Sequence, residues 1–250
     1  MIEVRDIQKK FGDTTVLKGI TTSFRQGVTS LIIGESGAGK TVFLKSLVGL
    51  HGIDQGEIFY DDRQLGKMNE DEQKALRTEM GMVFQGNALF DSLNIEENVI
   101  FALNMFSEMS AAEKKERADF CLERVNLKGV NNRKPAELSG GMKKRVAIAR
   151  AIALNPKYLF CDEPNSGLDP RTAILIDNLL QEITHEFNIT TVINTHDMNS
   201  VVEIGEHIIF IKDGAKAWEG GGEEILHTDN KAVTDFVFSS ELFRKIREKS

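Results

Sequence analysis

GESGAGKT, residues 34–41, is a glycine-rich loop that follows the apolar run 28–33 and precedes the helix-like segment 41–50. A strand that ends in such a turn can direct several backbone N–H groups at one anion, and the following helix adds the positive end of its dipole. Lys40 supplies a mobile charge for the β- and γ-phosphates of a nucleotide, and the Thr41 hydroxyl can bind Mg²⁺. The expected nucleotide contacts are Gly34, Glu35, Ser36, Gly37, Ala38, Gly39, Lys40, Thr41 and Val42.

Composition limits the classes of protein to consider. The chain has 250 residues, of which 41% are hydrophobic and 28% are charged. Such a chain can bury a sizeable core, and we expect one domain with an inserted lobe. The net charge of -7 argues against a nucleic-acid partner, because nucleic-acid binders usually present a basic surface.

The two cysteines, Cys121 and Cys161, have no metal-ligand spacing and indicate neither a disulfide framework nor a zinc site. They are expected to be small buried residues in a reducing compartment. The sequence has no signal-peptide layout at Met1, and no apolar run approaches the roughly 18 residues that span a bilayer. We therefore expect a cytosolic protein that needs a partner for any work at a membrane.

Hydrophobic periodicity predicts an α/β chain. Short strands separated by Gly and Asp turns are expected at 2–4, 20–24 and 56–60, and they suggest an antiparallel layer. Later segments alternate as in a parallel sheet wrapped by helices. These later segments are helices 142–154 and 172–187 and strands 157–161, 190–194 and 207–212. The mostly helical stretch of about 86–150, which includes a charged amphipathic helix at 110–126, interrupts this α/β pattern.

Asp162 and Glu163 end a short apolar strand that begins at Tyr158. The carboxyl ends of strands are where ligands gather in open α/β sheets. Asp162 suits a Mg²⁺ partner and Glu163 can polarise an attacking water. An isolated Asp-Glu pair is more often an acidic turn, but a phosphate loop in the same chain favours the catalytic interpretation.

Ser139, Gly140 and Gly141 stand at the start of a predicted helix. A hydroxyl and free N–H groups at a helix start form a second anion site. Taken alone, the stretch indicates only a capped loop. The basic run 143–145 that follows is expected to be a solvated helix face.

Together these residues resemble the ATP-binding cassette ATPases over nearly the whole chain. The matching motifs are GESGAGKT as the Walker A loop, Gln85 as the Q-loop, Leu138 to Met142 as the signature, Tyr158 to Glu163 as Walker B, Ser166 to Asp169 as the D-loop and His196 as the switch histidine. The resemblance implies a P-loop NTPase (RecA-like) core with an antiparallel β-subdomain and an inserted α-helical signature subdomain. The implied ATP-binding domain covers residues 1–238, and a short tail covers residues 239–250.

The family mechanism assigns a role to each of these residues. Glu163 would act as general base, His196 would hold the γ-phosphate and water in line, and Gln85 would touch Mg²⁺ or water. Two chains would face head to tail as a homodimer, so that Ser139, Gly140 and Gly141 of one chain contact the ATP of the other. Phe11, with Val16 nearby, stands where the family has an aromatic that stacks on adenine; without the resemblance it could equally be a core residue. The implied Mg²⁺ ligands are Thr41, Gln85 and Asp162.

The segment 85–93, QGNALFDSL, together with Met142 in the signature, is similar to the ATPases of Mla/Mce-type phospholipid transporters. This resemblance implies phospholipid transport between inner and outer membrane, a separate permease and an Mce-type substrate-binding protein. The ATPase would lie peripherally on the cytoplasmic side of the inner membrane. Phe90 is expected to contact the permease. The D-loop sequence 165–169 follows the general cassette form more than the variant of some Mla ATPases.

Three alternatives stay open at this point. The chain could serve a transporter of another substrate, or it could be a soluble cassette ATPase of the iron–sulfur assembly type. A cassette that only binds nucleotide for regulation is disfavoured because Glu163 and His196 are both present.

Overall fold

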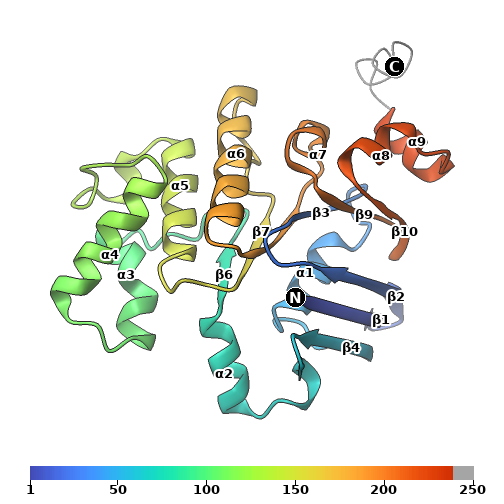
Figure 1. Cartoon of the computed structure of the whole chain (residues 1–250), viewed down its shortest axis with the longest axis horizontal. Coiled ribbons are helices and arrows are strands. Elements are labelled where there is room, and N and C mark those ends of the chain that lie inside the picture. Colours follow the sequence, from blue (N-terminus) through green and yellow to red (C-terminus); the bar gives the residue numbers. More distant parts are fainter. Residues whose placement is uncertain (239–250) are drawn as a thin grey trace. The chain divides into compact units, whose positions relative to one another are not determined.

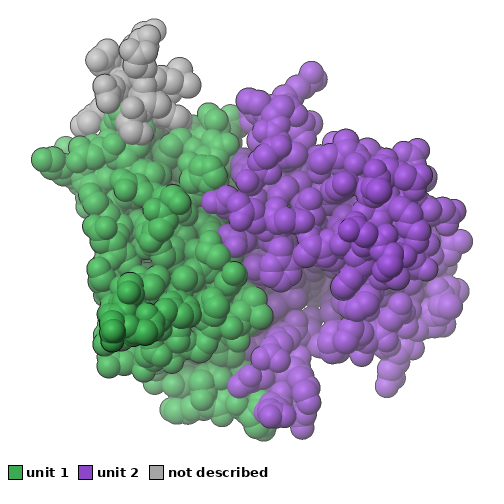
Figure 2. Space-filling model, turned by 180° about the vertical axis from the view of Figure 1, so that it is seen from behind, with its two compact units in different colours: residues 1–69, 190–250 green, residues 70–189 purple. Residues whose placement is uncertain are grey.

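The computed structural model describes residues 1–238, which form two compact units (Figure 1; Figure 2 colours the units separately). Unit 1 contains residues 1–69 and the chain from residue 190 onward, and unit 2 contains residues 70–189. The predicted tail, residues 239–250, lies outside the described residues. Within residues 1–238, no helix is long and apolar enough to cross a membrane.

Unit 1 contains the expected antiparallel sheet, with strand order β2-β1-β4-β5. Its strands are β1 (Ile2–Phe11), β2 (Thr14–Phe24), β4 (Gln55–Tyr60) and β5 (Arg63–Gln64). β1 continues well past the predicted end at Val4. Asp6 adopts a positive φ of 47°, the pairing register shifts there, and Ile7 returns to the core fully buried. A β-bulge therefore lets the strand continue past Val4, where the short predicted strand ended.

Unit 1 also holds a second group of strands, in the order β10-β9-β3-β8. Strands β3 (Thr29–Ile33), β8 (Thr190–Asn194) and β9 (His207–Lys212) are parallel, and β10 (Ala215–Gly220) pairs antiparallel with β9. Every residue of β3 and β8 is buried, as expected of central parallel strands. The helices of unit 1 are α1 (Lys40–Leu47), η1 (Leu65–Lys67), α7 (Met198–Ile204), α8 (Gly222–His227) and α9 (Lys231–Val237).

Unit 2 pairs two parallel strands, β6 (Met80–Val83) and β7 (Tyr158–Asp162). Its helices are α2 (Glu70–Thr78), α3 (Ile95–Phe106), α4 (Ala111–Arg124), η2 (Pro135–Glu137), α5 (Gly140–Ala151) and α6 (Pro170–Glu186). Helices α3, α4 and α5 pack on one another (Figure 1). α5 begins at Gly140, two residues before the predicted start, because the Ser139 hydroxyl accepts a bond from the Met142 N–H and caps the helix there.

Capping boxes fix the starts of α3 and α4. The Asn94 side chain accepts a bond from the Glu97 N–H at 2.8 Å, and the Glu97 carboxylate accepts one from the Asn94 N–H at 2.6 Å. Ser110 and Glu113 make the same reciprocal pair before α4. Each pair satisfies two N–H groups that a helix start leaves without partners.

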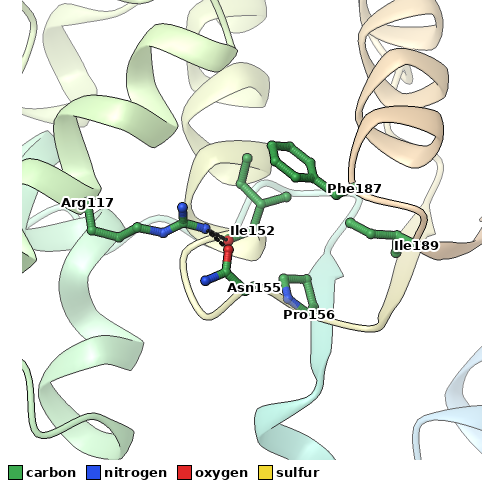
Figure 3. A pocket seen from close by; sticks show the side chains of 6 residues that line it. All are labelled: Arg117, Ile152, Asn155, Pro156, Phe187 and Ile189. Carbon is green, nitrogen blue, oxygen red and sulfur yellow. Dashed lines mark hydrogen bonds between the residues drawn. The ribbon is translucent and has the colours of Figure 1, made fainter.

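Arg117 ties α4 to the end of α5. Its guanidinium donates to the main-chain carbonyls of Ile152 at 2.8 Å and Ala153 at 2.9 Å, and also to the Asn155 side chain (Figure 3). Helix ends leave carbonyls without intrahelical partners, and a basic side chain is one way to satisfy them. A small pocket of about 120 Å³ lies beside this contact, with Phe187 on its wall (Figure 3).

Both cysteines are buried thiols, as the sequence predicts. Burial raises the pKa of Cys121 to about 11 and raises the pKa of Cys161 well above its usual range. Because a raised pKa keeps each thiol protonated at pH 8, and the thiolate is the reactive form, neither should react with iodoacetamide in the folded protein. Intact-mass spectrometry should show no adduct before unfolding and two adducts in guanidinium. Rapid alkylation of the folded protein would contradict the buried placement.

Candidate active site

The glycine-rich loop joins β3 to α1 within unit 1, and two of its glycines are required by geometry. Gly34 has φ +149°, and a Cβ atom there would lie 2.2 Å from the Ile211 carbonyl oxygen. Gly39 has φ +101°, and a Cβ atom there would lie 3.1 Å from the Val16 carbonyl oxygen. A side chain at Gly34 would collide with backbone, and at Gly39 the positive φ and the close carbonyl oxygen both disfavour one, so the loop conformation depends on glycine.

Lys40 and Thr41 begin α1 at the end of this loop. The Lys40 ammonium is nearly buried and donates to the carbonyl oxygens of Gly34 and Glu35, each at 2.9 Å. The Thr41 hydroxyl accepts a bond from the Asn194 side-chain amide at 3.2 Å. The structure therefore holds a cation and a hydroxyl at the positive end of a helix, which is the arrangement expected for binding phosphate.

Phe11 lies at the tip of the β1-β2 hairpin and exposes 45% of its surface. The His51 ring meets it edge-on with centroids 5.4 Å apart, and the Lys9 ammonium lies 5.3 Å from its centroid. The same hairpin brings the Val16 carbonyl against Gly39 of the loop. An exposed aromatic ring on the hairpin that borders the loop is suited to stacking on a base.

His196 follows β8 and is exposed. β8 pairs in parallel with β3, with Ile32 opposite Asn194, so His196 and the glycine-rich loop leave the same edge of the sheet. The neighbouring Thr195 N–H donates to the Ile32 carbonyl at 3.1 Å, which fixes the chain just before His196.

Asp162, Glu163 and Gln85 belong to unit 2 and come from two paired strands. β6 and β7 run in parallel with Val83 opposite Cys161, so Gln85 and Glu163 both follow the carboxyl ends of these strands. The Gln85 side-chain amide donates to the Glu163 carboxylate at 2.8 Å. Glu163 has a backbone φ of +48°, which residues other than glycine rarely adopt. Such backbone strain is common at functional sites. Asp162 is 7% exposed.

The predicted signature residues form the first turn of α5. Ser139 and Gly140 are exposed, and Gly141 is half-buried. A Cβ atom at Gly141 would lie 2.8 Å from a methyl carbon of Thr172 on α6. Gly141 therefore lets this turn pack closely against the start of α6, where Asp169 caps the helix through Thr172.

The expectation that residues 143–145 form a solvated face is wrong for Lys144, which is buried. Its side chain is only 3% exposed, and its ammonium donates to the carbonyl oxygens of Gln85 at 2.7 Å and Glu163 at 3.5 Å. Burial lowers the pKa of Lys144 from its usual value. The signal in the sequence is helical spacing, because Lys144 shares a stripe with the buried Ile148 and Ala151.

Arg150 is a second residue of α5 that the sequence interpretation did not single out. Its guanidinium donates to the carbonyl oxygens of Ala88 at 2.6 Å and Asn87 at 2.9 Å. Both loop residues have positive φ, at 50° and 63°. Arg150 thus holds a strained turn directly after Gln85, and no local pattern in the sequence pairs these distant segments.

The predicted site residues fall into two groups, one in each unit. Unit 1 holds the residues proposed for the base, the phosphates and the γ-phosphate: Phe11, Val16, Gly34, Glu35, Ser36, Gly37, Ala38, Gly39, Lys40, Thr41, Val42 and His196. Unit 2 holds the residues proposed for the water and the signature: Gln85, Ser139, Gly140, Gly141, Asp162 and Glu163.

Comparison with known proteins identifies the family. The model of the ABC transporter family matches residues 17–166, a span that includes the glycine-rich loop, Gln85, the signature and Glu163. The chain belongs to the ABC transporter family. Solved ABC cassettes share its fold: the dimeric post-hydrolysis structure of the ATP-binding cassette MJ0796, bound to ADP and Pi, is 34% identical with a TM-score of 0.80. That match covers 88% of this chain and 98% of the MJ0796 chain.

Two curated relatives are similar to this ABC transporter chain over most of its length. The methionine import ATP-binding protein MetN of Clostridium tetani (strain Massachusetts / E88) is 43% identical over 219 residues, covering 86% of this chain and 67% of MetN. The chloroplastic protein TRIGALACTOSYLDIACYLGLYCEROL 3 of Arabidopsis thaliana is 36% identical over 257 residues, covering 96% of this chain and 74% of that protein.

Membership in the ABC transporter family confirms the predicted fold class and the predicted ATPase activity. The chain is an ATP-binding, ATP-hydrolysing subunit of a transporter. ABC transporter ATPases act with a transmembrane permease and as dimers, which agrees with the permease and homodimer expected from the sequence. These relatives give no support to the iron–sulfur assembly alternative. They show a transporter ATPase and do not identify the transported substrate.

Proposed function

We propose that this chain powers the transport of phospholipid between the inner and outer membrane through a separate permease and an Mce-type substrate-binding protein. The main support is the resemblance of two features to the Mla/Mce-type ATPases: the segment QGNALFDSL at 85–93 and Met142 in the signature. The relative in Arabidopsis thaliana, which this chain matches over 96% of its length, is named after a glycolipid. The ATPase would lie peripherally on the cytoplasmic side of the inner membrane.

Nucleotide binding would be the work of unit 1. The loop N–H groups and the Lys40 ammonium would hold the β- and γ-phosphates, exchanging the carbonyl contacts of Lys40 for phosphate oxygens. Phe11 would stack on the adenine, with Val16 beside it. His196 would hold the γ-phosphate and the attacking water in line.

Mg²⁺ fits the donor set proposed for it. The Thr41 hydroxyl, the Gln85 amide oxygen and the Asp162 carboxylate are all oxygen donors, the type that Mg²⁺ prefers. When bound, the ion would neutralise charge on the phosphates. Rotation of the Gln85 amide, whose N–H now bonds Glu163, would be needed for Gln85 to present its oxygen.

Hydrolysis would depend on Glu163 as general base or water-orienting group. Its carboxylate accepts a bond from the Gln85 amide, and this proximity supports the proposal that both residues act on the same water. The N–H groups and hydroxyl of Ser139, Gly140 and Gly141 would contact the ATP bound by a second copy of the chain. The similar cassette MJ0796 is dimeric and bound to ADP and Pi, which supports the proposal of a nucleotide-binding dimer.

The permease would dock on an apolar hollow of unit 2. This hollow has a volume of about 370 Å³ and is lined by residues that include Met82, Phe84, Phe90, Phe101 and Arg150. Phe90 exposes 41% of its surface and stacks on Phe101 with centroids 4.5 Å apart. Leu89 and Leu93 of the same segment are half-buried, so the aromatic pair supplies the apolar contact surface.

Methionine import is the second candidate function. It is favoured by the 43% identity to MetN of Clostridium tetani. The two candidates differ in the partners of the complex, because the lipid transporter is proposed to include an Mce-type protein and bound phospholipid.

The deciding experiment is affinity purification of this chain from its native membranes, followed by mass spectrometry of bound proteins and lipids. Recovery of a permease with an Mce-type protein and phospholipid is the expected result. A permease without such a protein, or with a methionine-binding protein, would overturn the phospholipid assignment and leave the ATPase in place.

The same purification tests the docking hollow with a Phe90→Glu variant. A carboxylate in an apolar contact costs desolvation, so the variant is expected to lose the permease from the recovered complex. Retained ATP binding would show that the variant is folded. Normal recovery of the permease would exclude Phe90 from the interface.

A further inference from the structure

Lys144 is a charged side chain in a place where charge is costly. Its ammonium is buried within unit 2 and bonds two main-chain carbonyl oxygens, of Gln85 and of Glu163. Burying an ammonium costs several kcal/mol unless hydrogen bonds compensate it. An apolar residue could fill this position in the helix without that cost. The presence of a lysine therefore indicates that its two hydrogen bonds have a function.

The two carbonyls belong to residues whose side chains also bond each other. The Gln85 amide donates to the Glu163 carboxylate at 2.8 Å, while Lys144 connects the same two residues through their backbone. Each of the three residues therefore bonds the other two, and they come from α5, the segment after β6 and the segment after β7. The Glu163 carbonyl also accepts a bond from the Ser166 N–H at 3.2 Å.

Glu163 requires such support because of its backbone. Its φ of +48° is unfavourable for a residue with a side chain, and the surrounding structure must maintain it. The direction of the carboxylate follows from this backbone conformation. A contact that fixes the Glu163 carbonyl therefore also restricts where the carboxylate lies.

We propose that Lys144 is a positioning residue for ATP hydrolysis, which holds the backbones of Gln85 and Glu163 together and so places the Glu163 carboxylate for its work on water. This inference rests on the role proposed above for Glu163. It also connects the signature helix to the Glu163 carboxylate, because Lys144 belongs to α5, the helix that Ser139 caps.

The test replaces Lys144 by Met, and separately by Gln, in the complex purified with its permease. Loss of the contact should lower kcat roughly 10- to 100-fold, as small displacements of catalytic groups do. The KM for ATP should stay within about twofold, because uniform binding is untouched and the phosphate loop lies in unit 1. Lys144→Arg keeps the charge and several N–H donors and is expected to retain kcat within about threefold.

Lys115→Met, on the exposed surface of α4, is the matched control for loss of one lysine charge and should keep the wild-type kcat. Wild-type kcat in a Met or Gln variant that binds ATP normally would overturn the proposal. A loss in Lys144→Arg as large as in Lys144→Met would also overturn it, because an N–H donor at this position would then fail to restore turnover. Glu163→Gln in the same complex distinguishes failure of the Lys144 proposal from failure of the role proposed for Glu163. Normal turnover in Glu163→Gln would overturn the role of Glu163 itself.

Discussion

Replacing Glu163 by Gln is expected to lower ATP turnover by roughly 10²-fold or more, the loss that removal of a general base can cause. The amide has nearly the shape of the carboxylate but cannot take a proton from water. ATP binding should persist, because the phosphate loop and Phe11 belong to unit 1. Steady-state phosphate release from the purified complex gives the turnover, and equilibrium binding of ATP gives the affinity.

The variant should also accumulate the ATP-bound dimer, because the step that releases the two chains from each other is blocked. Size-exclusion chromatography with ATP would detect this species. Glu116→Gln, on the exposed surface of α4, serves as the matched control and should hydrolyse ATP like the wild type. Undiminished turnover in Glu163→Gln would remove this carboxylate from the mechanism and direct attention to His196.

Much of the fold follows from local patterns in the sequence. Strands 190–194 and 207–212 have the predicted bounds, since short runs rich in β-branched residues favour strands. The antiparallel layer was also predicted, although β1 is longer than expected because a bulge at Asp6 interrupts its alternation. Helix α3 was not delimited, yet Asn94 and Glu97 form a capping-box pattern that predicts its start.

For the candidate site, too, features within one continuous segment could be predicted from the sequence, whereas contacts between distant segments could not. The glycine-rich loop is one continuous stretch whose chemistry is visible in its sequence, and its geometry agrees with the pattern. The bond from Gln85 to Glu163 joins residues far apart in the chain, and only the pairing of β6 with β7 brings them together. Lys144 was misjudged because a run of three basic residues indicates solvent, whereas the helix turns the middle one inward.

Replacing Lys40 by Ala should weaken ATP binding by roughly 10- to 100-fold, the range expected when hydrogen bonds to a charged group are lost. The ammonium now lies on the carbonyl oxygens of Gly34 and Glu35, so it is already placed at the loop where the phosphates are proposed to sit. The loop itself should keep its shape in the variant, because its conformation depends on Gly34 and Gly39. Isothermal titration calorimetry with ATP measures the affinity directly.

Lys45→Ala is the control for this change, since Lys45 lies in the last turn of the same helix α1. It removes the same charge from the same element but at the end remote from the loop, and its ATP affinity should match the wild type. Equal weakening in both variants would indicate a general effect of charge on the unit rather than a phosphate contact. Unchanged affinity in Lys40→Ala would contradict the assignment of residues 34–41 as the phosphate loop, because the mobile cation is the part of that loop with the largest electrostatic contribution.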